Sequence, residues 1–139
     1  MKLRQVPLEY IEALFKNTMM ETLGIRCVEL GDDYVVATMP VDKRTHQPLG
    51  LLHGGASAAL IESIASMGST LLIDLEKEVP VGLEINANHI SGMKNGLVKA
   101  IGKLVHGGRR THVWQVDLFD NETEKLVCTG RLTVMIVPK

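Results

Sequence analysis

The chain has 139 residues, a formal net charge of −1 and only two cysteines, Cys27 and Cys128. This length predicts a single domain over residues 1–139, and the scattered Lys and Arg residues offer no basic face for nucleic acid. The cysteines show no CxxC or metal-ligand spacing, which predicts free thiols in a reducing compartment. The N-terminus lacks the continuous apolar stretch of a signal peptide, so we expect a cytoplasmic protein.

The first half of the chain predicts a helix and a β-hairpin ahead of a polar loop. Apolar residues recur at helical spacing over residues 7–20, and Pro7 suits a first helical turn. From Ile25 the apolar residues alternate instead, which predicts strands over 25–30 and 34–39 around a turn at 31–33. Pro40 ends the second strand. The loop over residues 41–52 then leads into the next helix.

A long helix predicted over residues 56–73 contains one ionisable residue, Glu62. Its other residues are small or apolar, and a helix that is apolar on nearly all sides is usually buried. Its length approaches that of a membrane span, but its five Ser and Thr residues and central Glu62 argue against one, so we expect no membrane partner. A buried carboxylate is costly unless it is paired or has a chemical task. Glu62 is therefore the first candidate for a functional residue.

Four strands are predicted after this helix, over residues 79–90, 97–105, 111–119 and 125–137. The order of elements lacks βαβ alternation, which argues against a doubly wound parallel sheet. The predicted fold class is α+β, with an antiparallel sheet of about five or six strands wrapped around one long central helix. In the 79–90 strand, alternation places four apolar residues on one face: Val81, Leu83, Ile85 and Ala87. The polar face opposite needs water or a partner subunit.

The start of the central helix and Glu62 are the candidates for chemistry. Gly54 and Gly55 stand where the free N–H groups and the positive end of the helix dipole can hold a developing oxyanion. Glu62 lies eight residues beyond Gly54, about 12 Å along the helix axis. If Glu62 acts on a group held by Gly54, that glycine belongs to another subunit. Small residues share the helix face of Glu62 and leave space for a ligand or a second chain: Ala58, Ala59, Ser66 and Ser69.

Each of these residues also has a structural explanation. Glycine is common at helix starts, His53 would cap the helix, and Gln47 would be solvated in its loop. A buried Glu62 would form hydrogen bonds with neighbouring backbone or serines, and from this residue alone that explanation is favoured over catalysis. The other histidines show no HxxxH or HxH spacing, so no metal site is predicted.

Residues 46–63 read HQPLGLLHGGASAALIES, and this stretch resembles the hotdog-fold acyl-CoA thioesterases. The branch it resembles uses glutamate and includes the 4-hydroxybenzoyl-CoA, 1,4-dihydroxy-2-naphthoyl-CoA and enterobactin-synthesis proofreading thioesterases. The similarity extends over nearly the whole chain, through LGI at 23–25, MPVDKRTHQP at 39–48, VGLEINANH at 81–89 and GR at 108–109.

The resemblance implies a hotdog fold and hydrolysis of an acyl-CoA or acyl-carrier thioester to free acid and thiol. It implies Glu62 as the nucleophile or general base, and a hydrogen bond from the Gly54 N–H to the thioester carbonyl. Gln47 and His53 would bind and polarise that carbonyl, and Ser66 would orient the attacking water. It also implies a homodimer with interfacial sites, doubled to a dimer of dimers, in which Glu62 comes from one subunit and the other groups come from its partner.

The remaining site expectations concern the rest of the substrate. Six residues are predicted to contact it: His89, Arg109, Arg110, Gly82, Leu49 and Met67. The cationic residues would contact the anionic CoA, although they are equally well explained as solvated residues of turns. The apolar side chains would accept an aryl or medium-chain acyl group. CoA is part of the substrate, and no other cofactor is expected.

Three alternatives remain beside thioester hydrolysis. A hotdog hydratase or dehydratase would resemble a GHFP or Asp/His pattern, and this chain has neither. A non-catalytic acyl-CoA-binding protein would not need Glu62. A purely structural oligomer would leave Glu62, Gln47 and His53 unexplained together.

Overall fold

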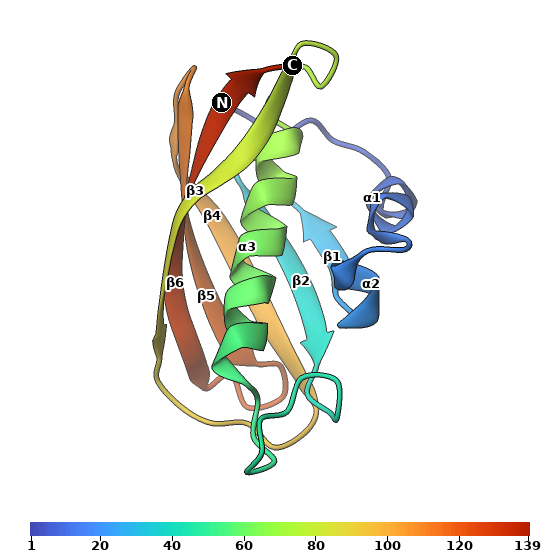
Figure 1. Ribbon diagram of the computed structural model, residues 1–139, viewed down its shortest axis with the longest axis vertical. Helices are drawn as coiled ribbons and strands as arrows, with labels where there is room; N and C mark the ends of the chain where they lie inside the picture. Colours follow the sequence, from blue (N-terminus) through green and yellow to red (C-terminus); the bar gives the residue numbers. More distant parts are fainter.

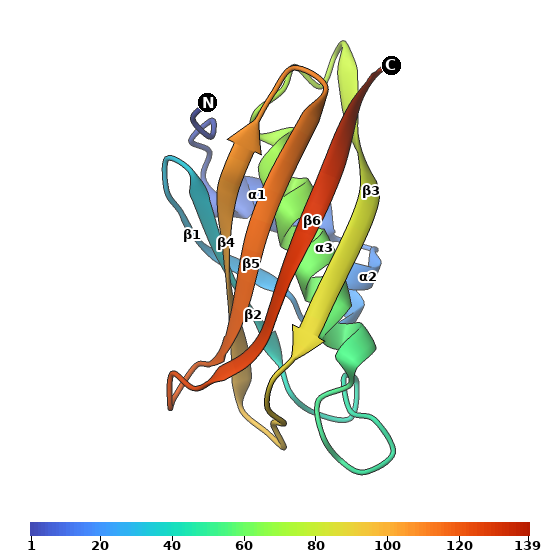
Figure 2. The ribbon, with the colours of Figure 1, turned by 90° about the vertical axis from the view of Figure 1, so that its left-hand side faces the viewer.

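The computed structural model describes all 139 residues and confirms the α+β architecture. A six-stranded antiparallel sheet curves around one long helix, α3 (Gly54–Thr70) (Figure 1). The strands are β1 (Arg26–Leu30), β2 (Tyr34–Pro40), β3 (Glu78–His89), β4 (Leu97–Gly107), β5 (Thr111–Asp120) and β6 (Leu126–Pro138). Their order in the sheet is β1-β2-β4-β5-β6-β3, so β1 and β3 form its two edges (Figure 2). No helix is long and apolar enough to cross a membrane.

The helix predicted over residues 7–20 is two short helices, α1 (Leu8–Phe15) and α2 (Met19–Thr22). Asn17 between them has a φ of 58°, a left-handed conformation that asparagine tolerates better than most residues and that interrupts a helix. The Thr18 hydroxyl donates to the Phe15 carbonyl at 2.6 Å and closes the end of α1. Ile11 and Phe15 anchor α1 in the core, and both helices lie on the β1 side of the molecule (Figure 1).

The core lies between α3 and the concave face of the sheet. Leu60, Ile61 and Ile64 of α3 are fully buried there, as is Trp114 of β5. Burial of this apolar face holds the helix against the sheet. Ser69 is also fully buried, and its hydroxyl accepts a hydrogen bond from the Trp114 indole N–H at 2.9 Å. The expectation that Ser69 lies on the open face beside Glu62 is therefore wrong, because the sheet covers this last turn of α3.

A bulge in β3 changes which side chains face the helix. Gly82 pairs with Val134 of β6, but the register shifts before Glu84, which pairs with Thr133. A bulge adds one residue to a strand, and a one-residue slip turns every side chain to the other face. Val81 consequently points to the convex face and Ile85 to the concave face, so the single apolar face predicted for this strand is incorrect for Val81. At Gly82 no side chain faces α3, and the bare backbone lies against the helix.

The loop over residues 41–52 is held firmly at the start of α3. Thr45 is buried, its hydroxyl donates to the Pro40 carbonyl at 2.8 Å, and its own carbonyl accepts from the His53 N–H at 2.8 Å. Gly50 adopts a φ of 77°, which a side chain would disfavour, and lets the loop turn back. These contacts fix the positions of Gln47 and His53.

Candidate active site

His53 caps α3 and is thereby fixed as a hydrogen-bond donor. The Gly55 N–H donates to His53 Nδ1 at 2.7 Å. A ring nitrogen that accepts a hydrogen bond carries no proton, so the proton of the neutral ring is on Nε2. The capping explanation offered for His53 is therefore correct, and it leaves an Nε2–H group available to a ligand.

Gly54 is the first residue of α3, and its N–H has no acceptor within the chain. The His89 ring lies directly against it, because a Cβ at position 54 would stand 2.9 Å from His89 Nε2. A side chain here would displace the imidazole and cover the N–H. Glycine thus keeps a backbone donor open at the positive end of the helix.

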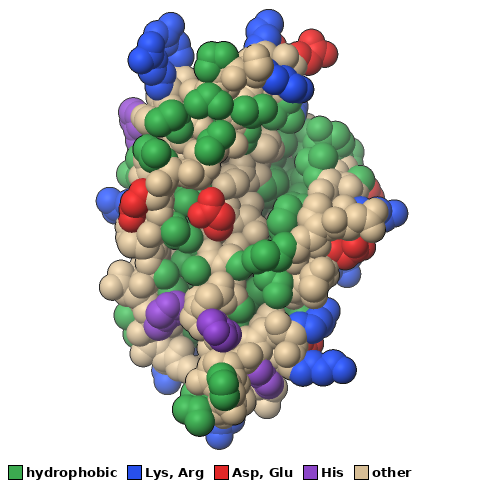
Figure 3. Space-filling model, in the orientation of Figure 1, with side chains coloured by type: hydrophobic (Ala, Val, Ile, Leu, Met, Phe, Trp, Pro, Cys, Tyr) green, Lys and Arg blue, Asp and Glu red, His purple; other side chains and the backbone are tan.

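Gln47 adds a second donor next to Gly54. Its Oε1 accepts from the Leu49 N–H, which leaves the Nε2 hydrogens without an acceptor in the chain. Gln47 lines a cleft of about 330 Å³, which we call the Gly54 cleft, between the loop, the first turn of α3 and the end of β3. Its polar side is formed by Gln47, Gly54, Ser57, His89 and Ser91. Histidine side chains gather on this part of the surface (Figure 3).

Glu62 lies two turns further along α3, with Ser66 and Gly82. Burial raises the pKa of Glu62 above its ordinary value, and a hydrogen bond with the Ser66 side chain partly offsets this rise. A Cβ at Gly82 would stand only 2.2 Å from Glu62 Oε1, so the carboxylate rests on the bare backbone of β3. The bulge described above therefore creates the space that the carboxylate occupies.

The predicted residues fall into two groups within one chain. Gln47, His53, Gly54 and His89 meet at one end of β3, whereas Glu62, Ser66 and Gly82 meet further along it. Gly82 and His89 are seven positions apart on β3, a distance of about 23 Å along an extended strand.

Four other predicted residues lie outside both groups. Arg109 and Arg110 are exposed on the β4–β5 turn, where the Arg110 carbonyl accepts from the Ile136 N–H at 2.8 Å near the start of β3. Leu49 is 83% exposed on the loop. Met67 belongs to the hydrophobic core, with 5% of its surface exposed.

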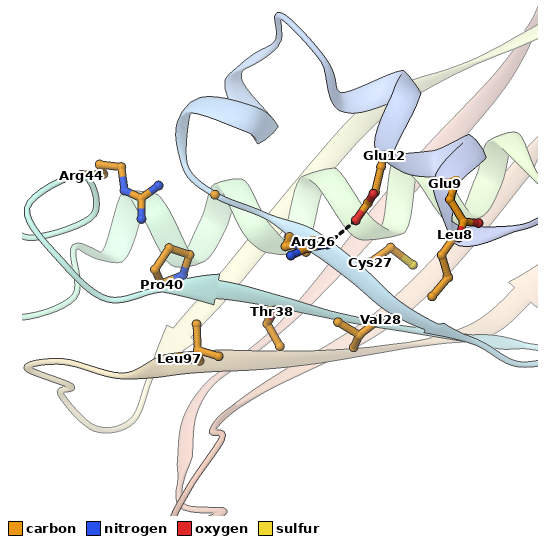
Figure 4. Close-up of a pocket in the computed structure, with 11 residues that line it drawn as sticks. Leu8, Glu9, Glu12, Arg26, Cys27, Val28, Thr38, Pro40, Arg44 and Leu97 are labelled. Carbon is orange, nitrogen blue, oxygen red and sulfur yellow. Dashed lines mark hydrogen bonds and ion pairs between the residues drawn. The ribbon is translucent and has the colours of Figure 1, made fainter.

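A larger cavity, of about 760 Å³, contains none of the predicted site residues (Figure 4). It lies between α1 and the outer face of β1, β2 and β4. Its cations are already paired, since Arg26 contacts Glu12 at 2.6 Å and Arg44 contacts Asp42 at 2.7 Å. Burial raises the pKa of the Cys27 thiol to about 11, so this residue is not an activated nucleophile.

Ser57 and Ser91 of the Gly54 cleft were missed by sequence reasoning. Ser57 lies three residues after Gly54, one helical turn away, and this spacing was available in the sequence. Ser91 had no such signal, because only the packing of the end of β3 against the start of α3 places it here.

Comparison with known proteins agrees with this fold. Residues 49–127 match the model of the thioesterase superfamily. The chain is 48% identical to the 1,4-dihydroxy-2-naphthoyl-CoA hydrolase of Escherichia coli, over 96% of this chain and 97% of that protein. It is 43% identical to the proofreading thioesterase EntH of Cronobacter sakazakii, over 96% of each. A solved thioesterase from Pseudomonas aeruginosa superposes with a TM-score of 0.95 and 46% identity, over all of both chains.

The chain therefore belongs to the thioesterase superfamily and has its hotdog fold. Its relatives and structural neighbours are thioesterases and esterases, which identifies it as a thioester hydrolase. The predicted family, fold and enzyme class are confirmed, and the hydratase and non-catalytic alternatives are set aside.

Proposed function

We propose that the protein hydrolyses an acyl-CoA thioester at a site shared by two subunits, with Glu62 from one and the Gly54 turn from the other. The observation that carries this proposal is the unpartnered Gly54 N–H beside the free Gln47 amide in one cleft. Two donors that converge on one point stabilise the oxyanion that forms when a thioester carbonyl is attacked. The His53 Nε2–H, held by the cap, is a third donor at the same turn.

Glu62 supplies the group that starts the reaction. As a carboxylate it either attacks the carbonyl carbon, giving an anhydride that water cleaves, or removes a proton from the attacking water. Both routes consume one water molecule and release a carboxylic acid and a thiol. Its raised pKa makes it a stronger base than an exposed carboxylate, which favours either role. The Ser66 hydroxyl beside it is placed to orient that water.

A second copy of the chain completes the site. β3 is an edge strand, and Val81 and Leu83 on it are 48% and 57% exposed, which makes this edge a template for pairing. If two β3 strands pair antiparallel about a two-fold axis midway between Gly82 and His89, near residues 85–86, Gly82 of one subunit meets the partner's His89. Glu62 of the first subunit then faces Gly54 of the partner subunit.

The same two-fold pairing places cations near the substrate. Arg109 and Arg110 lie on the β4–β5 turn near the start of β3, which in an antiparallel pair adjoins the end of the partner's β3 and its Gly54 cleft. There they would meet the phosphates of CoA, which is substrate rather than cofactor. The polar convex face, where Asp117 accepts from Thr129 at 2.6 Å, fits the further doubling to a dimer of dimers. Cys27 and Cys128 are free and buried, in keeping with a cytoplasmic location.

The test of this function is release of free thiol from benzoyl-CoA by Glu62→Gln, which keeps the shape of the side chain and removes its charge. We expect turnover to fall by about 10²-fold or more, the effect of losing a general base or nucleophile. Glu9→Gln is the matched control, because Glu9 is an exposed carboxylate on α1, on the β1 side of the molecule and away from the β3 edge. Turnover by Glu62→Gln equal to that of Glu9→Gln would overturn the assignment.

A further inference from the structure

The loop over residues 90–96 links β3 to β4 at the end of the molecule that carries the Gly54 cleft (Figure 1). It contains the only Asn-Gly pair of the chain, Asn95-Gly96. Both residues are exposed, and Gly96 has a φ of 85° with open space where a side chain would stand. An asparagine side chain can react with the backbone nitrogen of the next residue, and a glycine there has no Cβ to obstruct the approach.

Hydrogen bonding separates this asparagine from the two others that lie outside the strands. The N–H that follows Asn17 donates to the carbonyl of the last residue of α1 at 3.3 Å. The N–H that follows Asn121 donates to the Asp120 carboxylate at 2.9 Å. By contrast, the Gly96 N–H has no acceptor within the chain, and the Asn95 side-chain amide forms no hydrogen bond. The remaining two asparagines are held within β3, so both reacting groups are free only in this loop.

We propose that Asn95 is a site of spontaneous deamidation and backbone rearrangement. The Gly96 nitrogen gives up its proton to a base in the solvent and forms a bond to Asn95 Cγ. The Cγ–Nδ2 bond breaks, and the departing nitrogen takes up a proton and leaves as ammonia. One water molecule then opens the cyclic imide. Opening at Cγ gives an aspartate, and opening at the main-chain carbonyl gives an isoaspartate, whose backbone runs through Cβ and Cγ.

Two carbonyls hold the 41–52 loop, one on each side of the modified residue. The Lys94 carbonyl accepts from His46 Nε2 at 2.8 Å, and the Gly96 carbonyl accepts from the Val41 N–H at 2.9 Å. An isoaspartate places one extra carbon atom, about 1.5 Å of backbone, between these carbonyls. A hydrogen bond lengthened by that amount is lost. The two loops therefore cannot keep both contacts unless the backbone around them shifts.

This shift would reach the active site through Gln47. Gln47 directly follows His46, and its side chain lines the Gly54 cleft. A misplacement of about 1 Å costs roughly 10²-fold in rate. This consequence rests on the proposed function, since it takes Gln47 to contact the thioester carbonyl. Molecules with an isoaspartate should therefore be nearly inactive and still folded, because Asn95 is not part of the hydrophobic core.

The experiment incubates the full chain in mildly alkaline buffer and follows three quantities in the same samples. Peptide mass spectrometry gives deamidation at each asparagine, methyl labelling by an isoaspartyl methyltransferase gives isoaspartate, and thiol release from benzoyl-CoA gives turnover. We expect isoaspartate to form faster at Asn95 than at Asn17 or Asn121. The turnover that remains should equal the fraction of molecules without isoaspartate, with the thermal unfolding transition retained.

Asn95→Gln is the matched control, because its amide lies one methylene further along the side chain and forms the corresponding ring far more slowly. It should keep its turnover over the same incubation. Asn95→Asp carries the charge of the aspartate product without the extra backbone atom, and freshly prepared protein should match the wild type. Reduced turnover in this variant would overturn the backbone explanation.

Two results in the wild type would also overturn the proposal. Deamidation at Asn95 that is no faster than at Asn121 would exclude the site. Isoaspartate at Asn95 with unchanged turnover would exclude its link to Gln47. Failure of the proposed function is distinguishable, since it appears as full activity in Glu62→Gln, whereas the mass of the Asn95 peptide does not depend on activity.

Discussion

Gly82→Ala should inactivate the enzyme without unfolding it. The added Cβ would stand 2.2 Å from Glu62 Oε1, whereas ordinary van der Waals contact begins at 3.4 Å. The carboxylate must therefore withdraw by about 1.2 Å, the difference between these distances. A misplacement of about 1 Å costs roughly 10²-fold in rate. We expect kcat to fall by this factor.

Stability should hardly change in this variant. The side chain that gives way is the free end of a flexible Glu62, and Gly82 has no left-handed backbone that alanine would strain. Thiol release and thermal unfolding, measured together, separate the two effects. Gly102→Ala is the matched control, because its Cβ would press on Ile64 on the buried side of α3, at 3.1 Å. Wild-type kcat in Gly82→Ala would refute the reasoning that the position of the carboxylate governs turnover.

Three further outcomes follow from the same geometry. The kcat/KM of the wild type should rise with pH through the raised pKa of Glu62. Ser66→Ala should move this rise to higher pH, because the hydrogen bond from Ser66 lowers the pKa of Glu62. An unchanged pH profile in this variant would contradict a hydrogen bond between Ser66 and Glu62. Burial lowers the pKa of His112, so below about pH 6.5 the unfolded chain binds more protons and the free energy of unfolding should fall. Urea titrations at about pH 8 and about pH 5 should show that the free energy of unfolding falls less between these pH values in His112→Asn than in the wild type. Finally, Ile85→Cys or Asn86→Cys should form an intersubunit disulfide under oxidation if the two-fold axis crosses β3 there; a monomeric product from both would exclude this register.

The sequence was sufficient for the architecture because its periodicity is strong. The change from helical to alternating spacing at Ile25, and the apolar helix around Glu62, each correspond to an element of the structure. Two details depended on local backbone events that periodicity does not record. Asn17 splits the first helix by adopting a positive φ, and the bulge after Gly82 turns Val81 outward.

The site was only partly predictable for a different reason. The rise of an α-helix was sufficient to predict that Glu62 and Gly54 of one chain are too far apart to share a site. In the structure they belong to two separate groups of residues. The contact between Gly82 and the carboxylate depends on the bulge, and the contact between Gly54 and His89 depends on where β3 ends. Met67 was expected beside the substrate because it is apolar, but its side chain is buried in the core.

The shared active site is tested most directly by mixing two inactive variants. Glu62→Gln removes the carboxylate, and Gly54→Val places a side chain against His89 and covers the donor. Neither homodimer should hydrolyse benzoyl-CoA. After subunit exchange in equal amounts, half of the dimers are mixed and each has one intact site, so about a quarter of wild-type activity should return. A mixture that contains heterodimers by mass spectrometry and stays inactive would contradict a site built from two subunits.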